Sequence, residues 1–182
     1  MSAFRVSRTG RVNAPAVMVY RLIADYHNGH PRIVPPEYFF NFAVEEGGYG
    51  AGTRITFDAR MLGVTQHARA WIEEPEPGRV LLERLEVGWV TTFTVDAVGP
   101  AACDVTIATE VPPKRGMAGW FERFVAARIL PRIYVAELSR IEQVALEMGS
   151  GGRFRGPPGG QWGRTPIGVV TMPPPRAPPR GG

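Results

Sequence analysis

The most constraining feature of this sequence is a single change in the spacing of its apolar residues. From Phe4 to Glu110 they alternate with polar residues in short segments, which is the period of half-buried strands. From Met117 to Met148 they recur every three or four residues, which predicts an amphipathic helix of roughly 30 residues, about 45 Å long at 1.5 Å per residue. In a chain of 182 residues such a helix must lie across the strands.

The strand-like segments follow one another through short connections, which predicts an antiparallel meander. The clearest alternation, in residues 53–61, places Ile55 and Phe57 on one face. Pro77 and Gly78 have the order that a type II turn requires at its two central positions. We expect about seven strands, at residues 4–12, 39–45, 53–61, 65–73, 79–85, 87–96 and 103–110.

Two shorter elements complete the expected α+β domain. Asn13 is a suitable N-cap for a helix that ends near Tyr26, and Pro15 fits its first turn, where a helix leaves N–H groups unbonded. Residues 27–36 contain three prolines and one glycine, so we expect a loop with at most one helical turn. Pro131 predicts a bend or break in the long helix.

The C-terminal residues differ in composition from the rest. Residues 149–182 contain ten glycines and eight prolines, too few apolar groups to offset the entropy of ordering. We therefore expect a domain at 1–148 and a disordered Arg/Gly/Pro-rich tail at 149–182. The tail is either passive or a docking segment, for example through Pro173–Pro179 in polyproline II form.

The net charge of +4 comes from this tail, which holds five arginines and no acidic residue and so leaves −1 on residues 1–148. A domain that grips phosphates needs a clustered excess of positive charge. Nucleic-acid binding by the domain is therefore not expected, and the tail could support at most a weak, salt-sensitive contact.

The cellular compartment is inferred from what the sequence lacks. Cys103 is the only cysteine, so no intrachain disulfide is possible. No segment has the length and apolarity of a signal peptide or a membrane span. These features predict a soluble, cytoplasmic protein, and they leave its oligomeric state open.

A single helix is too narrow to cover the expected sheet. Seven strands side by side span about 33 Å, whereas a helix is about 10 Å across. The sheet must curl around the helix, and a large empty space there would be destabilising, so we expect a cavity that holds an apolar guest. Its candidate lining residues, each of which could instead be ordinary core, are Phe57, Met61, Trp89, Phe93, Ile107, Trp120, Phe124 and Tyr134.

His67 is a further candidate, in the middle of a strand and on the same face as Arg69. If that face is concave, the two side chains could anchor a carboxylate or phenolate. If it is convex, they are ordinary solvated residues. The strand pattern leaves both alternatives open.

The densest polar cluster lies at residues 25–30. His27 or His30 could act as a general base on an acidic ligand proton, with Asp25 orienting the imidazole. The alternative is a structural loop in which these side chains cap backbone groups. A metal site of His27, His30 and Glu37 has no defensible ligand geometry, and we expect neither a metal nor another cofactor.

The order of these elements resembles a known superfamily. Asn13–Pro15 ahead of the first helix, the Glu76–Arg79 turn, the strand Val90–Val95, the strand Thr106–Glu110 and the long terminal helix are similar to the START/Bet v 1-like (SRPBCC) superfamily. Within it the chain is most similar to bacterial polyketide cyclase/dehydrase-like proteins. The resemblance covers residues 1–148 and implies a helix-grip fold with a hydrophobic pocket.

The superfamily includes lipid carriers, hormone receptors, cyclases and chaperone activators, so the resemblance implies no single activity. Our first hypothesis is the binding or carriage of a small hydrophobic ligand, such as a lipid, an isoprenoid or an aromatic polyketide-like molecule. The alternative is a polyketide cyclase, aromatase or dehydratase that uses the same cavity with histidine acid–base catalysis.

Overall fold

The computed structural model describes residues 3–113 and 116–150, without the side chain of residue 118. The expected disordered tail lies outside the described residues from residue 151 onward. Within the described residues, ten elements occur in this order: β1 (Phe4–Val12), α1 (Ala16–Ala24), α2 (His30–Ile33), β2 (Phe39–Glu46), β3 (Arg54–Met61), β4 (Val64–Glu76), β5 (Val80–Leu85), β6 (Val90–Gly99), β7 (Ala102–Val111) and α3 (Gly116–Gly149).

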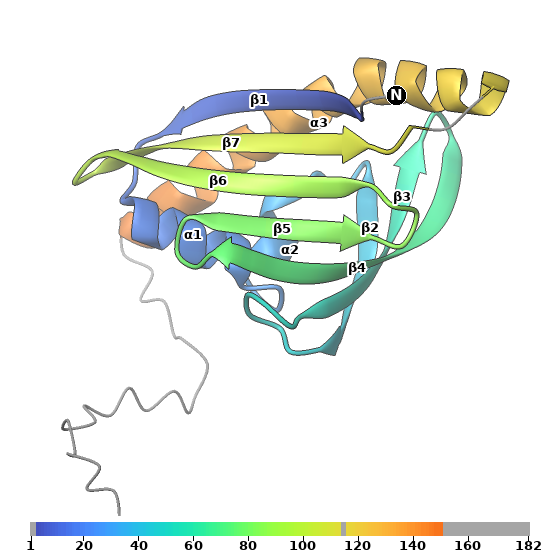
Figure 1. The fold of residues 1–182 in the computed structure, drawn as a ribbon. Helices are drawn as coiled ribbons and strands as arrows, with labels where there is room; N and C mark the ends of the chain where they lie inside the picture. Colours follow the sequence, from blue (N-terminus) through green and yellow to red (C-terminus); the bar gives the residue numbers. More distant parts are fainter. Residues whose placement is uncertain (1–2, 114–115, 151–182) are drawn as a thin grey trace, which may run out of the picture. The chain divides into compact units, whose positions relative to one another are not determined.

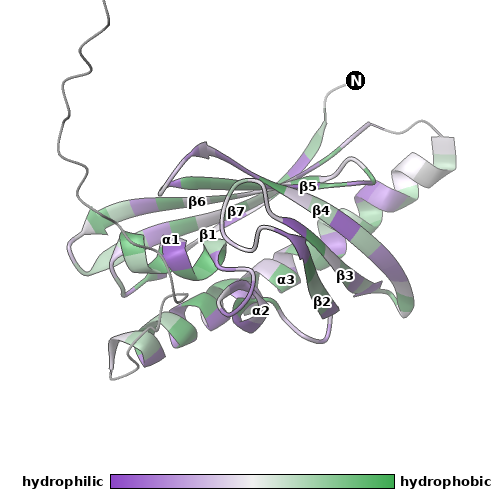
Figure 2. Ribbon diagram, turned by 90° about the horizontal axis from the view of Figure 1, so that it is seen from below, coloured by the Kyte–Doolittle hydropathy of each residue, from purple (hydrophilic) through white to green (hydrophobic). Residues whose placement is uncertain are grey.

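The strands form one antiparallel seven-stranded sheet in the order β1-β7-β6-β5-β4-β3-β2. Helices α1, α2 and α3 lie on the same side of it (Figure 1). Seen from below, β2, β3 and β4 turn away from the plane of β1, β7 and β6 and toward α3 (Figure 2). The predicted α+β helix-grip fold, a curved sheet around a long terminal helix, is confirmed.

Irregular pairing accompanies this curvature. The register of β2 against β3 shifts twice, between Phe40 and Ala43 and again between Val44 and Glu46. Asn41, inside the first shift, has a positive φ of 55°. Extra residues of this kind bend a strand and increase its twist, so they help β2 to curve toward α3.

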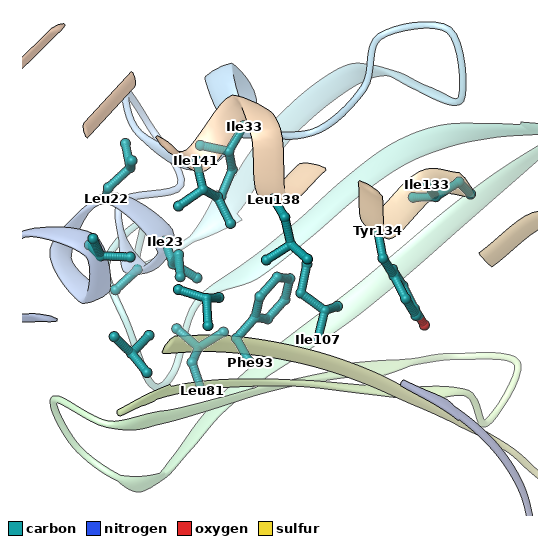
Figure 3. Close-up of a cluster of buried hydrophobic side chains, with 14 of the residues drawn as sticks. Leu22, Ile23, Ile33, Leu81, Phe93, Ile107, Ile133, Tyr134, Leu138 and Ile141 are labelled. Atoms are coloured by element: carbon teal, nitrogen blue, oxygen red, sulfur yellow. The ribbon is translucent and has the colours of Figure 1, made fainter. Parts of the chain in front are cut away.

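The core fills the space between the helices and the concave face of the sheet. Figure 3 shows Leu138 of α3 directed toward Phe93 and Ile107 of the sheet, and Ile141 of α3 beside Ile33 of α2. Helix α1 contributes Leu22 and Ile23 to the same cluster, and each of these two side chains is almost fully buried. This packing holds the second half of α3 against the sheet.

One local prediction, and the predicted break at Pro131, differ from the structure. Pro15, not Asn13, occupies the N-cap position of α1, and the Asn13 side-chain amide donates to Glu142 Oε1 at 2.7 Å instead. Pro131 does not break α3, which runs through it as one helix. Leu130 and Ile133, on either side of the proline, are buried, and this burial offsets the backbone hydrogen bond that proline cannot donate.

Candidate functional site

A pocket of about 70 Å³ lies between α3 and the concave face of the sheet. A cavity of about 150 Å³ holds a benzene molecule, so this pocket is smaller than the space that the width of the sheet suggested. Three aromatic rings that contact one another line the pocket. The rings of Phe42 and Phe57 stack at 5.2 Å between centroids, and the ring of Phe39 meets Phe57 edge-on at 5.8 Å. Phe39 and Phe42, on β2, were not among the expected lining residues.

The structure divides the expected apolar lining into three groups. Five of the residues line the pocket, namely Phe57, Met61, Trp89, Phe93 and Tyr134. Ile107 is fully buried in the core but does not line the pocket. Trp120 and Phe124 are 68% and 52% exposed, and their rings stack on each other at 5.7 Å. The reason is that the first turns of α3 extend past the ends of β1 and β7, as Figure 1 shows.

His67 lies outside the pocket, on the convex face. It pairs with Asp58 across β3 and β4, and its Nδ1 atom is 3.0 Å from Asp58 Oδ1. Because successive side chains of a strand point to opposite faces and Phe57 points into the pocket, Asp58 points to the convex face. His67, its cross-strand partner, lies on that same face. Arg69 is held on the same face by Glu45 at 3.1 Å. His67 and Arg69 therefore cannot bind a carboxylate group of a ligand in the pocket.

The polar cluster at residues 25–30 is split by the structure. Asp25 Oδ1 accepts hydrogen bonds from the backbone N–H groups of His27 and Asn28, each at 3.0 Å, so it caps the turn after α1. His27 is exposed and packs against Gly48. Only His30, which is 2% exposed, lines the pocket. Asp25 therefore does not orient the imidazole that faces the pocket.

His30 is held by contacts at both ring nitrogens. Nδ1 lies 2.9 Å from the carbonyl oxygen of Ile23, which can only accept, so Nδ1 carries a hydrogen. Nε2 lies 3.3 Å from Glu83 Oε1, and this contact needs one proton, on either the imidazole or the carboxyl group. The Tyr26 ring stacks on the imidazole at 4.4 Å between centroids. These contacts hold Nε2 at the wall of the pocket.

Tyr26 completes the support of Glu83. Its hydroxyl donates to Glu83 Oε1 at 2.6 Å in the buried interior. Burial, and then the neighbouring Glu83 carboxylate, raise the pKa of the Tyr26 phenol well above its usual range. Tyr26 thus keeps its proton and donates it in a hydrogen bond. Glu83 Oε1 therefore has two side-chain partners, the neutral Tyr26 hydroxyl and the His30 imidazole.

Glu137 is the second carboxyl group of the pocket and is 5% exposed. Burial, followed by the charge of Glu83, raises the pKa of Glu137 well above its usual range, which favours the protonated acid. No other residue in the described part of the chain forms a hydrogen bond with its carboxyl group. Both its donor and its acceptor capacity are therefore directed at the pocket.

Tyr134, one helical turn before Glu137, also lines the pocket. Figure 3 shows its side chain pointing from α3 toward the sheet. Its buried hydroxyl has no hydrogen-bond partner among the described residues, although it lies beside Thr109, which bonds to Thr91 at 2.8 Å. Burial raises the pKa of Tyr134 to about 12, so the hydroxyl keeps its proton at neutral pH.

The sequence does carry a signal for Glu83 and Glu137, which were not among the expected site residues. Glu83 lies between Leu81 and Leu85 at the two-residue period of the inward face of β5. Glu137 lies four residues before Ile141, inside the apolar stripe of α3. A charged residue at a core position of an otherwise apolar pattern points to a functional group, because burial of a charge is costly.

Two classes of site are not found in residues 3–113 and 116–150. No group of three or more histidine, cysteine, aspartate or glutamate side chains is arranged to hold a metal ion there. Within the same segments, no helix combines the length and the apolarity needed to cross a bilayer.

Comparisons with known proteins agree with this fold. A family model described as polyketide cyclase/dehydrase and lipid transport matches residues 3–146. The KanY protein is 24% identical, with a TM-score of 0.70 over 80% of this chain and 99% of that one. The ZhuI aromatase/cyclase from Streptomyces sp. R1128 is 18% identical, with a TM-score of 0.67 over 81% of this chain and 96% of that one.

A plant enzyme has the same fold. Norcoclaurine synthase from Thalictrum flavum, in complex with dopamine and hydroxybenzaldehyde, is 16% identical, with a TM-score of 0.62 over 82% of this chain and 90% of that one. No curated protein matches the sequence significantly.

Proposed function

Because this chain belongs to the polyketide cyclase/dehydrase and lipid transport family, we propose that it binds a small, mainly apolar molecule in the pocket beneath α3. The polar end of this ligand contacts Glu137 and Tyr134. One observation carries the proposal: both side chains are buried at the wall of the pocket, the Tyr134 hydroxyl lacks a hydrogen-bond partner of good geometry among the described residues, and the raised pKa of Glu137 has no hydrogen bond among its causes. Buried polar groups are costly without partners, and a bound ligand supplies them.

The pocket is smaller than a cavity that holds one benzene ring, so even a single-ring ligand requires lining side chains to move. Met61 is a partly exposed lining residue whose side chain can move to make room. Methionine is flexible and adapts its shape to a guest. The likeness to norcoclaurine synthase, whose structure contains dopamine and hydroxybenzaldehyde, also supports a single-ring aromatic ligand.

Toluene and benzyl alcohol are suitable probes for binding. We expect titration of ¹⁵N-labelled protein with either compound to shift the amide signals of residues around Phe57, Phe93 and Tyr134. Extraction of freshly purified protein into an organic solvent, followed by mass spectrometry, identifies any ligand that copurifies. A protein that yields no extract and binds neither probe would refute the proposal.

A second function, catalysis of a dehydration or cyclisation, is favoured by the joint presence of His30 and Glu137 in one pocket. In a β-hydroxy ketone, His30 Nε2 would give up its 3.3 Å contact with Glu83 and take the proton from the carbon next to the carbonyl group. The electron pair of that C–H bond would form the new C=C bond as the C–O bond breaks. Glu137 would protonate the departing hydroxyl group, which leaves as water.

Dehydration of 4-hydroxy-4-phenylbutan-2-one to its conjugated enone can be followed by ultraviolet absorbance. His30→Gln should lower the rate at least about 100-fold, which is typical for loss of a general base, and His27→Gln serves as the exposed, matched control. A thermal melt by circular dichroism checks that the His30 variant is folded. Equal rates in the wild type and a folded His30 variant would exclude this role.

A further inference from the structure

The lining of the pocket contains more acidic than basic side chains. Among the described residues that line it, Glu83 and Glu137 are carboxyl groups, His30 is the only base, and none is an arginine or lysine. Tyr134 keeps its proton at neutral pH. The lining can therefore carry at most one positive charge, and that charge would have to be on His30.

Any charge on His30 is already committed to Glu83. The Nδ1–H group points to the carbonyl oxygen of Ile23 at 2.9 Å, and Nε2 lies 3.3 Å from Glu83 Oε1. Both nitrogens therefore face protein oxygens. A protonated His30 and an ionised Glu83 neutralise each other, and no cation remains for a ligand.

A ligand carboxylate in this pocket would be a buried negative charge without a counter-ion. Such a charge is strongly disfavoured in a protein interior, and two carboxyl groups nearby increase the cost. An uncharged hydroxyl or carbonyl group has no such cost and can bond to Tyr134 or Glu137. A protonated amine has a further advantage, because an ionised Glu137 would be its counter-ion.

We propose, on the basis of the binding function above, that the pocket accepts ligands whose polar end is uncharged or a protonated amine and rejects carboxylates, and that Glu137 sets this preference. Glu137 has this role rather than Glu83, because Glu83 already bonds to Tyr26 at 2.6 Å and contacts His30. The carboxyl group of Glu137 has no such partner in the described part of the chain.

The first experiment compares four single-ring probes that differ only in the polar group: toluene, benzyl alcohol, benzylamine and sodium benzoate. Affinities are measured at neutral pH by titration of ¹⁵N-labelled wild-type protein. Benzoate should bind at least roughly tenfold more weakly than benzyl alcohol, because a single unpaired buried charge costs more than the 1.4 kcal/mol that a tenfold difference represents. Benzoate affinity equal to or higher than that of benzyl alcohol would overturn the proposal.

The second experiment tests Glu137 with the near-isosteric variant Glu137→Gln. The ratio of benzylamine to benzyl alcohol affinity should fall roughly tenfold, because the amide cannot become an anion. Glu147→Gln, on an exposed part of the same helix, is the matched control and should keep the wild-type ratio. An unchanged ratio in a folded Glu137→Gln protein would remove Glu137 from the proposal.

These results also separate the selectivity from the binding function. If toluene and benzyl alcohol both fail to bind to the wild type, the binding function itself is refuted. If they bind and benzoate binds equally well, binding stands and only the charge selectivity is refuted.

Discussion

Replacement of Glu137 by glutamine should change the way in which the stability of the protein depends on pH. The pKa of Glu137 is raised in the folded state by burial and by Glu83, from an ordinary value of 4.5. The folded protein therefore binds a proton that the unfolded chain releases above that pH. The stability contributed by this proton is fully present below pH 4.5 and is lost as pH rises toward the folded-state pKa.

The size of the effect follows from linkage. Between the two pKa values, the free energy of unfolding of the wild type falls by about 1.4 kcal/mol per pH unit through this group, and Glu137→Gln lacks this dependence. For a domain of this size the difference corresponds to about 3–6 °C in Tm per pH unit. The advantage of the variant over the wild type should therefore grow by that amount between about pH 5 and about pH 6.

Urea denaturation followed by circular dichroism at both pH values provides the measurement. The other titrating groups are present in both proteins and largely cancel in the difference. Any cost of burying the glutamine amide is independent of pH, so it shifts the difference without changing its slope. Glu147→Gln should run parallel to the wild type. Parallel curves for Glu137→Gln and the wild type would show that Glu137 ionises freely in the folded protein, and the assignment of a buried acid would fail.

Three further substitutions test the packing around the site. Phe57→Ala should lower the free energy of unfolding by about 3–5 kcal/mol in urea titrations and should admit naphthalene, which the wild type excludes, as an equilibrium binding assay can show. Gly29→Ala should cost more than about 2 kcal/mol by the same titration, because the added Cβ would lie 2.2 Å from the carbonyl oxygen of Leu22; wild-type stability would contradict this close contact. His67→Ala should leave the affinity for benzyl alcohol unchanged in the NMR titration, since its side chain is 68% exposed on the convex face; a weakened affinity would place that face in the site.

Much of the fold could be predicted because apolar residues recur every two positions in its strands and every three or four positions in its long helix. The alternation in residues 53–61 correctly places Ile55 and Phe57 inside, and the three- and four-residue spacing after Met117 marks α3. Local signals were less reliable where tertiary contacts compete with them. Asn13 has the chemistry of an N-cap, but Glu142 on α3 offers its side chain a partner that the local sequence does not reveal.

The site was harder to predict because its position depends on where each element ends on the sheet. Trp120 and Phe124 share the apolar stripe of α3 with Tyr134, but only the part of the helix that lies over the sheet buries its stripe. Similarly, His27 and His30 are equivalent in the sequence pattern. The single helical turn of α2 directs His30 inward and leaves His27 exposed.

The contrast between Asp25 and Glu137 indicates which buried carboxyl group has a structural role. Both are 5% exposed. Asp25 accepts two backbone hydrogen bonds and fixes a turn, so its burial contributes to the fold. Glu137 has no such bond in the described part of the chain, and its raised pKa means that it lowers stability at neutral pH. A leucine of similar volume would pack there without that cost. A residue that weakens the fold and faces a pocket is best explained by an interaction with what the pocket binds.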